Sequence, residues 1–355
     1  MSIPQLSVCV PTYNRSRMLR DLVASFHICS RPDVELVISD DASPDDTRLT
    51  IEIAQKFDER IVYSRNDRNL GFCANLREAM RQARGKLILI LGDDDVLASD
   101  TALDEVIRAF SKNPEAYFGY PNLVQIDSNL RFEYGYRHFA ADTAFPPGKP
   151  SFKSVWLKSI FISGICFRTF DHFLETYPID TLLFPQVWMT GRIIAHHQTI
   201  GLSSYLIGAR MHGDQLGFRA NKGQDIKGPE KHGNIEIVRM ARLLKSEGLD
   251  VPDVDEVARM LAVSNSTTIV SEKINGSNEI LQRNMAGFLE ESRSPLHDPR
   301  FVLALGLTLL TPRPVLKTLR ETGKFILRSG QGGIRRNYER CLAKTLRART
   351  EIWGD

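Results

Sequence analysis

Short apolar runs alternate with amphipathic stretches along the first hundred residues. Apolar runs predict buried strands at residues 6–10, 34–38, 61–63 and 87–91. Apolar residues at helical spacing predict helices at about residues 18–26, 43–57 and 72–83. Strands that alternate with helices in this way predict an α/β fold with a doubly wound, mostly parallel sheet.

Polar motifs follow these strands. Pro11-Thr12-Tyr13-Asn14-Arg15 follows the first strand, Ser39-Asp40-Asp41-Ala42-Ser43 the second, and Asn69-Leu70-Gly71 lies beyond the third. Parallel strands present their carboxyl ends at one edge of a sheet, and ligands of open α/β sheets bind at that edge. We therefore expect these motifs to form one binding site.

Three consecutive carboxylates, Asp93-Asp94-Asp95, follow Gly92 at the end of the fourth strand. Their mutual repulsion is costly, and a hard divalent cation bound to an anionic ligand such as a nucleotide diphosphate would offset it. The alternative is a solvated acidic turn, because Asp is common in turns and helix caps.

These motifs, in this order and at this spacing, resemble glycosyltransferase family 2, with the GT-A fold of nucleotide-diphospho-sugar transferases. The resemblance is firm over residues 3–125 and looser over 150–215, and is closest to non-processive, abequosyltransferase-like bacterial enzymes that build surface polysaccharide such as O-antigen. It implies transfer of one sugar from a nucleoside-diphosphate sugar to a hydroxyl of a polysaccharide or lipid-linked acceptor. It also implies Mn²⁺ or Mg²⁺ as cofactor, which would stabilise the departing diphosphate.

The resemblance assigns roles to residues on the donor side. Thr12 and Tyr13 would line the pocket for base and ribose. Asp41 would accept a hydrogen bond from a base N–H, with Asp40 as the alternative, and Gly71 would let the backbone pass close to the nucleotide. The remaining donor-side residues implied are Pro11, Asn14, Arg15, Asn69, Asn75 and Asp93, together with Asp94 for the ribose and Asp95 for the metal, with Asp94 as its second ligand.

The general base departs from the family pattern. Inverting members place a Glu-Asp pair near the acceptor, but the corresponding stretch at residues 180–188 has Gln186, which cannot accept a proton at neutral pH. The candidates are therefore Asp180, Asp171, His212 and Asp214. Both inverting and retaining outcomes stay open.

Two further segments are expected to complete the acceptor side. Residues 159–168 resemble the small-residue segment that lines the acceptor in this family, with Ser163 and Gly164, followed by a helix that carries Phe170 and Phe173. An ordinary core strand is the alternative. Residues 208–219 are rich in glycine and charge, which is typical of a mobile lid or a solvated loop, and a lid would bring Arg210 to the diphosphate.

Composition favours a cytoplasmic enzyme. The five cysteines form no CxxC pair and leave an odd thiol, as expected in a reducing compartment. No apolar run reaches the length of a membrane span, and no secretory signal is expected at the start of the chain. A net charge of +3 gives no indication of nucleic-acid binding, and we expect none.

Charge is concentrated at the C-terminal end. Residues 312–355 contain 11 Lys and Arg against 4 Asp and Glu. Lys317, Arg320, Lys324 and Arg328 recur at helical spacing beside apolar residues, which favours peripheral contact with an anionic membrane at the cytoplasmic face, with packing on the catalytic domain as the alternative.

We expect a GT-A catalytic domain at 1–215, with a nucleotide-sugar half (1–125) and an acceptor half (126–215). A lid or linker at 216–233 and a helical C-terminal region at 234–355 would follow, with helices near 235–249, 253–270 and 275–291. Two rival functions remain. The first is a sugar-1-phosphate nucleotidyltransferase, which needs a glycine-rich turn after the first strand. This chain lacks such a turn, and the same absence disfavours an NAD-dependent enzyme. The other is an inactive homologue that binds nucleotide.

Overall fold

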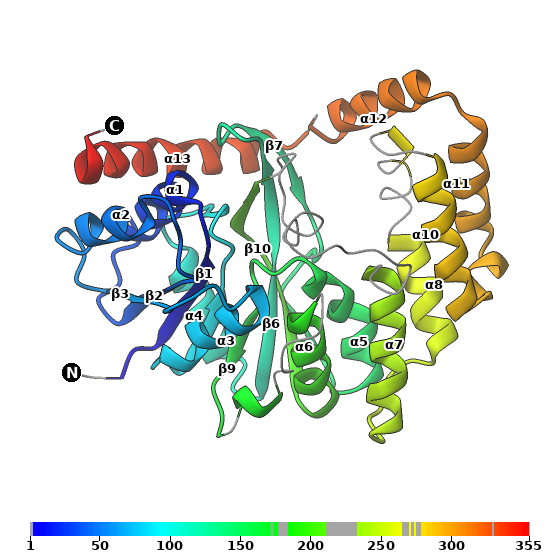
Figure 1. Ribbon diagram of the computed structural model, residues 1–355, viewed down its shortest axis with the longest axis horizontal. Coiled ribbons are helices and arrows are strands. Elements are labelled where there is room, and N and C mark those ends of the chain that lie inside the picture. The colour runs from blue at the N-terminus through cyan, green and yellow to red at the C-terminus, as the bar shows by residue number, and fades with distance from the viewer. Residues whose placement is uncertain are drawn as a thin grey trace.

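The computed structural model describes residues 3–171, 173–176, 184–210, 233–264, 270, 273–274, 278–328 and 330–354. Within them a ten-stranded sheet crosses the molecule in the order β3-β2-β1-β4-β9-β6-β10-β5, with β7 on β6 and β8 on β10 (Figure 1). The strands are β1 (Leu6–Thr12), β2 (Val34–Asp40), β3 (Ile61–Arg65), β4 (Leu87–Ile90), β5 (Val96–Leu97), β6 (Ala116–Ile126), β7 (Phe132–Tyr136), β8 (Thr143–Phe145), β9 (Cys166–Arg168) and β10 (Gln198–Arg210).

Helices cover the sheet and extend beyond it on one side, where α7, α8, α10 and α11 stand away from the N-terminal half (Figure 1). The α-helices are α1 (Ser16–His27), α2 (Thr47–Ala54), α3 (Phe72–Gln82), α4 (Ala102–Lys112), α5 (Lys149–Val155), α6 (Pro185–His196), α7 (Gly233–Ser246), α8 (Val254–Ser264), α10 (Asn278–Glu291), α11 (Pro299–Leu310), α12 (Arg313–Arg328) and α13 (Gly332–Trp353). Short 3₁₀ helices are η1 (Trp156–Ile160), η2 (Phe173–Thr176) and η4 (Ser294–His297).

The first four strands of the sheet order are parallel, as the sequence predicts. Val8 of β1 pairs with Leu36 on one side and Leu89 on the other, so the carboxyl ends of β1, β2 and β4 lie together at one edge. Every residue of these three strands is buried, which explains their nearly continuous apolar character. Antiparallel β9 then lies between β4 and β6 and joins the two halves of the sheet.

The predicted helix with Phe170 and Phe173 is found only as the short η2, which contains Phe173 but not Phe170. The Thr169 N–H donates to the Lys86 carbonyl at 3.0 Å, so strand-like pairing continues one residue past β9, and the Phe170 carbonyl then accepts from the Phe173 N–H at 3.1 Å where η2 begins. Phe170 lies outside any helix and packs against Tyr117, and only η2 follows it. Residues 159–168 are thus only partly a core strand, because β9 comprises Cys166–Arg168 alone and η1 ends at Ile160.

The C-terminal helix α13 returns to the N-terminal half and lies across α1 (Figure 1). Its buried face includes Tyr338, Cys341 and Ile352, and the Trp353 indole N–H donates to the Thr50 carbonyl of α2 at 3.2 Å. α13 therefore supports the domain that carries the first polar motif. Within the described residues no helix is both long enough and apolar enough to span a membrane.

A buried ion network joins α13 to the sheet. Asp21 of α1 accepts from the Arg210 guanidinium at the end of β10 at 2.9 Å, and from Arg349 of α13 at 2.7 Å. The Asp21 and Arg210 side chains are only 5% and 3% exposed. Charges so far from water depend on their partners, because an unpaired buried ion costs several kcal/mol.

We expect Asp21→Asn to lower the free energy of unfolding by about 3 to 5 kcal/mol, because it leaves two guanidinium groups without their carboxylate. Urea denaturation measures the change. Glu52→Gln is the matched control: its pair with Arg48 is exposed, and its loss should cost less than about 0.5 kcal/mol. An Asp21→Asn loss no larger than that of the control would contradict the importance of the network.

Candidate functional site

The acidic cluster follows β4, and the motif after β1 binds it directly. The Thr12 hydroxyl donates to Asp93 Oδ2 at 2.9 Å. Arg15 Nη1 donates to Asp93 Oδ1 at 2.9 Å and to Asp94 Oδ2 at 2.8 Å. The two motifs that the sequence singled out are therefore one cluster in space, with a single guanidinium beside two carboxylates.

Asp95 points toward the other half of the sheet. Its Oδ2 accepts from the Ser163 hydroxyl at 2.5 Å, and its Oδ1 accepts from the backbone N–H of Arg210 at 2.7 Å. The side chain is 2% exposed. Ser163 also accepts from the Gly92 N–H at 2.8 Å, so the segment before β9 holds both ends of the acidic turn.

Burial and mutual repulsion make this cluster electrostatically unfavourable. Burial raises the pKa of Asp93 to about 6, with the Arg15 guanidinium opposing the rise and the Asp94 carboxylate adding to it. Burial, followed by the Asp94 charge, raises the pKa of Asp95 well above its ordinary value, against the hydrogen bond from Ser163. A cation bound here would relieve this repulsion.

The residues present fit a divalent cation. A Cβ atom on Gly92 would lie 3.0 Å from Asp94 Oδ1 and 3.4 Å from Asp95 Oδ2, so two carboxylate oxygens border the space that the missing side chain leaves open. Carboxylate oxygens are the ligands that Mg²⁺ and Mn²⁺ prefer. The described residues contain no group of three or more Asp, Glu, His or Cys placed around one metal position, so such an ion would need ligands from a substrate or water.

Asp41 is buried at the end of β2 and holds the loop before α3. Its Oδ1 accepts from the Leu70 N–H at 2.7 Å, and its Oδ2 accepts from the Gly71 N–H at 2.9 Å. Gly71 has φ of +84°, which favours glycine, while no atom lies within 4 Å of the position of its absent Cβ. The backbone conformation, rather than crowding, explains the glycine.

Asp40 and Asn75 have all their polar atoms engaged within the protein. Asp40 accepts from the Ser43 N–H at 2.8 Å, and from Tyr63 Oη and Arg65 Nη1 at 2.7 Å each. Asn75 accepts from the Ser39 hydroxyl at 2.7 Å, and its amide donates to the carbonyls of Ser39 and Thr12. These contacts join the ends of β1, β2 and β3, so both side chains fix the positions of the strand ends that carry the polar motifs.

The remaining donor-side residues differ in accessibility. Tyr13 is 44% exposed beside the acidic cluster, whereas Pro11 is buried in β1. Asn14 has φ of +56°, and its N–H donates to Ser43 Oγ at 2.9 Å, which sets the turn that presents Tyr13. The exposed Asn69 caps its own turn by accepting from the Gly71 N–H at 3.1 Å.

On the acceptor side, several expected residues have roles within the fold. Gly164 has φ of +101°, and a Cβ there would lie 3.0 Å from Pro121. Gln186 is buried, and its amide donates to the Ile160 carbonyl at 3.1 Å. The Arg210 guanidinium binds Asp21, so its backbone rather than its side chain reaches the acidic cluster.

The candidate bases are placed unevenly. Asp171 is described and exposed, next to η2. Asp180, His212 and Asp214 lie outside the described residues, as does most of the segment expected to form a lid.

Sequence reasoning missed Asp21, which no motif contains. The signal was present: Asp21 lies among Leu19, Leu22 and Val23 on the apolar face of α1, where an acid needs a partner. It also assigned Arg15 to the substrate, whereas the structure pairs it with Asp93 and Asp94.

Comparison with known proteins agrees with this geometry. Residues 7–175 match the sequence model of glycosyl transferase family 2. This match covers just under half of the chain, which is therefore similar to this family over its N-terminal part. The matched residues contain the four polar motifs and Ser163, so the whole acidic cluster except the Arg210 contact falls within the family 2 segment.

The curated relatives of this chain include bacterial glycosyltransferases. The chain is 33% identical over 142 residues to the GalNAc(5)-diNAcBac-PP-undecaprenol β-1,3-glucosyltransferase of Campylobacter jejuni, a match that covers 40% of this chain and 45% of the relative. It is 37% identical over 99 residues to the abequosyltransferase RfbV of Salmonella typhimurium, covering 27% and 30%. The chain therefore matches less than half the length of each of these relatives.

Among solved structures, the Staphylococcus aureus TarS fragment 1-349 in complex with UDP-GlcNAc is similar to this chain with a TM-score of 0.57. The similarity covers 95% of this chain and 92% of TarS 1-349 at 17% sequence identity. A likeness at this identity shows a shared fold, and the predicted GT-A fold is confirmed.

The raised pKa of Asp93 generates a pH-dependent stability test. A carboxyl whose pKa is about 6 in the folded protein, against an ordinary value of 3.8, binds a proton more readily in the folded state. Its negative charge therefore destabilises the fold fully above pH 6. This cost is lost gradually as the pH falls from 6 toward 3.8. We expect Asp93→Asn to gain about 1.4 kcal/mol relative to wild type between pH 5 and pH 7.5. Urea denaturation at both pH values measures it; a difference that does not change with pH would contradict the buried repulsion.

Proposed function

We propose that this chain is a metal-dependent glycosyltransferase that moves a sugar from a nucleoside-diphosphate sugar to an acceptor hydroxyl in surface-polysaccharide or lipid-linked oligosaccharide synthesis. One observation carries the proposal. Two carboxylate oxygens, from Asp94 and Asp95, and the Ser163 hydroxyl converge within 3.4 Å of one point beside Gly92 at the carboxyl edge of the sheet, and Arg15 binds Asp94. Such a cluster fits a cation and the diphosphate that the cation binds.

Asp94 and Asp95 would hold Mn²⁺ or Mg²⁺, which stabilises negative charge on the departing diphosphate. Ser163 and the Arg210 N–H fix Asp95 by donating one hydrogen bond to each of its oxygens, which leaves the remaining lone pairs for the cation. Arg15 fixes Asp94 in the same way. The protein thereby orients both carboxylates before the substrate arrives, which is electrostatic preorganisation.

The base and ribose would bind beside Tyr13, whose exposed ring is available for stacking. Asp41 would act on this pocket by fixing the Leu70–Gly71 backbone. Its Oδ1 accepts from both Leu70 and Asn66, so the second lone pair of Oδ2 is the one available to a base N–H. For the general base, Asp180, His212 and Asp214 remain our candidates. The reaction needs one such group within hydrogen-bond reach of the acceptor hydroxyl.

We expect one sugar nucleotide among UDP-, GDP-, dTDP- and CDP-sugars to raise the thermal unfolding midpoint in the presence of Mn²⁺, because a ligand that binds the folded state stabilises it. Tyr13→Ala should weaken its binding by about 1 to 3 kcal/mol, the usual value for base stacking on an aromatic ring. Calorimetry measures both. Phe57→Ala, which removes an exposed ring after α2, is the control.

Turnover distinguishes the rivals. Slow hydrolysis of the bound sugar nucleotide with Mn²⁺ supports the transferase. Tight binding without hydrolysis or transfer would favour the inactive homologue, and release of diphosphate from a nucleoside triphosphate and a sugar phosphate would favour the nucleotidyltransferase.

We also propose that α11 and α12 contact an anionic membrane from the cytoplasmic side, where a lipid-linked acceptor would be found. The surface formed by Leu303, Leu307 and Leu310 of α11 with Val315 and Leu319 of α12 is exposed, up to 84% at Leu310. α11 lies at the end of the molecule away from the N-terminal half, and α12 leads from it back toward β7 (Figure 1). Lys317 and Arg320 lie on α12 with Val315 and Leu319. Each cation near an anionic surface contributes on the order of 1 kcal/mol to membrane binding.

We expect the triple variant Leu303→Gln, Leu307→Gln and Leu310→Gln to lose binding to anionic vesicles at low salt while it keeps nucleotide binding. Because these side chains are exposed, the unfolding midpoint should not fall. Point variants are the right test, since removal of residues 312–355 would also remove α13. Co-sedimentation measures binding, with Leu49→Gln, an exposed leucine of α2, as control. Failure of the wild-type protein to co-sediment with anionic vesicles at low salt would disprove membrane contact.

A further inference from the structure

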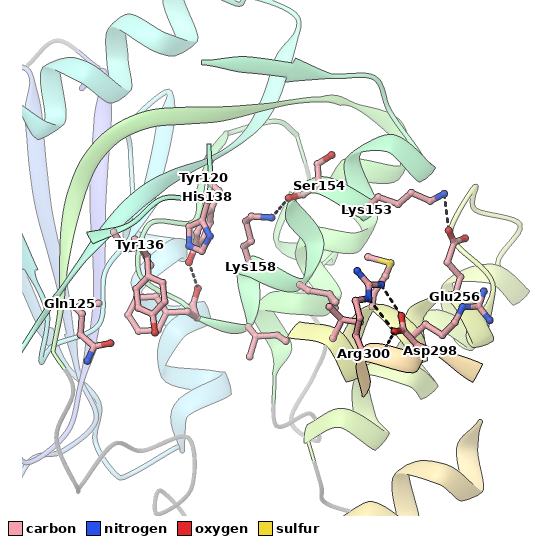
Figure 2. A pocket seen from close by; sticks show the side chains of 18 residues that line it. Tyr120, Gln125, Tyr136, His138, Lys153, Ser154, Lys158, Glu256, Asp298 and Arg300 are labelled. Carbon is pink, nitrogen blue, oxygen red and sulfur yellow. Dashed lines mark hydrogen bonds and ion pairs between the residues drawn. The ribbon is translucent and has the colours of Figure 1, made fainter. Parts of the chain in front are cut away.

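A cavity of about 740 Å³ lies between the sheet and the C-terminal helices. Its sheet side is formed by β6 and the chain at and after β7, and its other sides by α5, η1, α8 and the start of α11 (Figure 2). Residues from the sheet and from the helices that follow it thus enclose one space, which neither the acidic cluster nor the polar motifs occupy.

The cavity borders the acidic cluster through two segments. Ala209 lines the cavity, and the N–H of the next residue, Arg210, donates to Asp95. Tyr120 also lines it and donates to the Phe161 carbonyl at 3.2 Å, two residues before Ser163. Burial, followed by the Asp95 charge, raises the pKa of Tyr120, as expected of neighbours. A molecule in the cavity would therefore lie next to the proposed cation site.

The charges that line the cavity do not balance. Lys153 pairs with Glu256, and Arg300 pairs with Asp298, each at 2.7 Å. Lys158 has no carboxylate partner among the described residues: its ammonium group donates to the Ser154 carbonyl and lies 5.4 Å from the centre of the Phe139 ring. It projects between the aromatic and the ion-paired walls (Figure 2).

Lys158 is partly buried, and burial alone lowers its pKa. Arg259 of α8, also partly buried, likewise has no carboxylate partner within the described residues. Cations withdrawn from water without a counter-ion are unfavourable, and a bound anion would remove this cost.

Flat rings line the opposite wall. His138 is nearly parallel to Tyr136, with ring centres 6.1 Å apart and an interplanar angle of 7°, and it meets Tyr120 edge-on at 5.8 Å. Burial and the nearby Lys158 charge lower the pKa of His138 to about 4, so it is neutral at pH 7. Ring faces with a neutral imidazole and phenol hydroxyls suit a sugar, which presents apolar faces edged with hydroxyls.

We propose that this cavity binds the acceptor through a phosphate group, as in a lipid diphosphate, held by Lys158 and Arg259 with the attached sugar against Tyr136 and His138. The identity of the bound molecule as the acceptor rests on the proposed transferase function, whereas the binding of an anion in the cavity does not. Arg and Lys are the usual ligands of phosphate, Arg through its planar fork and Lys as a point charge.

The test uses geranylgeranyl diphosphate in mild detergent with EDTA, so that the cation site cannot bind it, and measures affinity by calorimetry. We expect wild-type protein to bind, and Lys158→Met and Arg259→Gln each to weaken binding about 10-fold or more, the effect of losing a charged hydrogen bond. The neutral alcohol geranylgeraniol should not compete. Lys112→Gln, an exposed lysine of α4, is the control. Lys158→Met should also raise the unfolding midpoint, because it removes an unpaired, partly buried charge.

Equal affinity in wild type and both variants would overturn the proposal, as would a lower midpoint for Lys158→Met, which would make the lysine structural. Glucuronic acid is the parallel ligand: if it binds through Lys158 while the diphosphate does not, the anion is a sugar carboxylate and the phosphate assignment is wrong. Nucleotide binding in Mn²⁺, measured on the same samples, separates the two failures. Its absence refutes the transferase, and its presence with no diphosphate binding refutes only the cavity.

Discussion

Mutual repulsion among Asp93, Asp94 and Asp95 at the end of β4 is the constraint around which the site is built. Two of the three are almost fully buried, and the structure supplies a donor for each: Thr12 and Arg15 from the β1 side, Ser163 before β9, and the Arg210 N–H at the end of β10. These donors come from segments far apart in the chain, so the cluster forms only when both halves of the sheet are assembled. Arg15 is the one charged donor and offsets only part of the negative charge of three carboxylates, which leaves the cluster suited to a cation.

The same region joins the two ends of the chain. Arg210 gives its N–H to Asp95 and its guanidinium to Asp21, which also binds Arg349 of α13. The last helix therefore stabilises the strand end that positions Asp95. The cavity between the sheet and α8 lies beside the cluster, because Ala209 lines it and the N–H of the next residue, Arg210, donates to Asp95.

The sequence predicted the parallel strands and the meeting of their polar motifs, because buried parallel strands have continuous apolar runs and one common carboxyl edge. It could not assign Asp40 and Asn75, since a buried cross-link and a ligand contact use the same side chains. It placed a helix at Phe170 because aromatic spacing does not reveal pairing to Lys86. Asp21, Lys158 and Arg259 needed tertiary structure, because their partners, or the lack of them, depend on segments distant in sequence.

The most direct test of the central claim is electron paramagnetic resonance of Mn²⁺ titrated with the protein and the nucleoside diphosphate that binds it. The account predicts one bound Mn²⁺ per chain when nucleotide is present, weak Mn²⁺ binding without it because protein carboxylates supply only part of the ligand set, and loss of the bound signal in Asp95→Asn. Nucleotide binding that leaves all Mn²⁺ free, or an unchanged signal in Asp95→Asn, would contradict it.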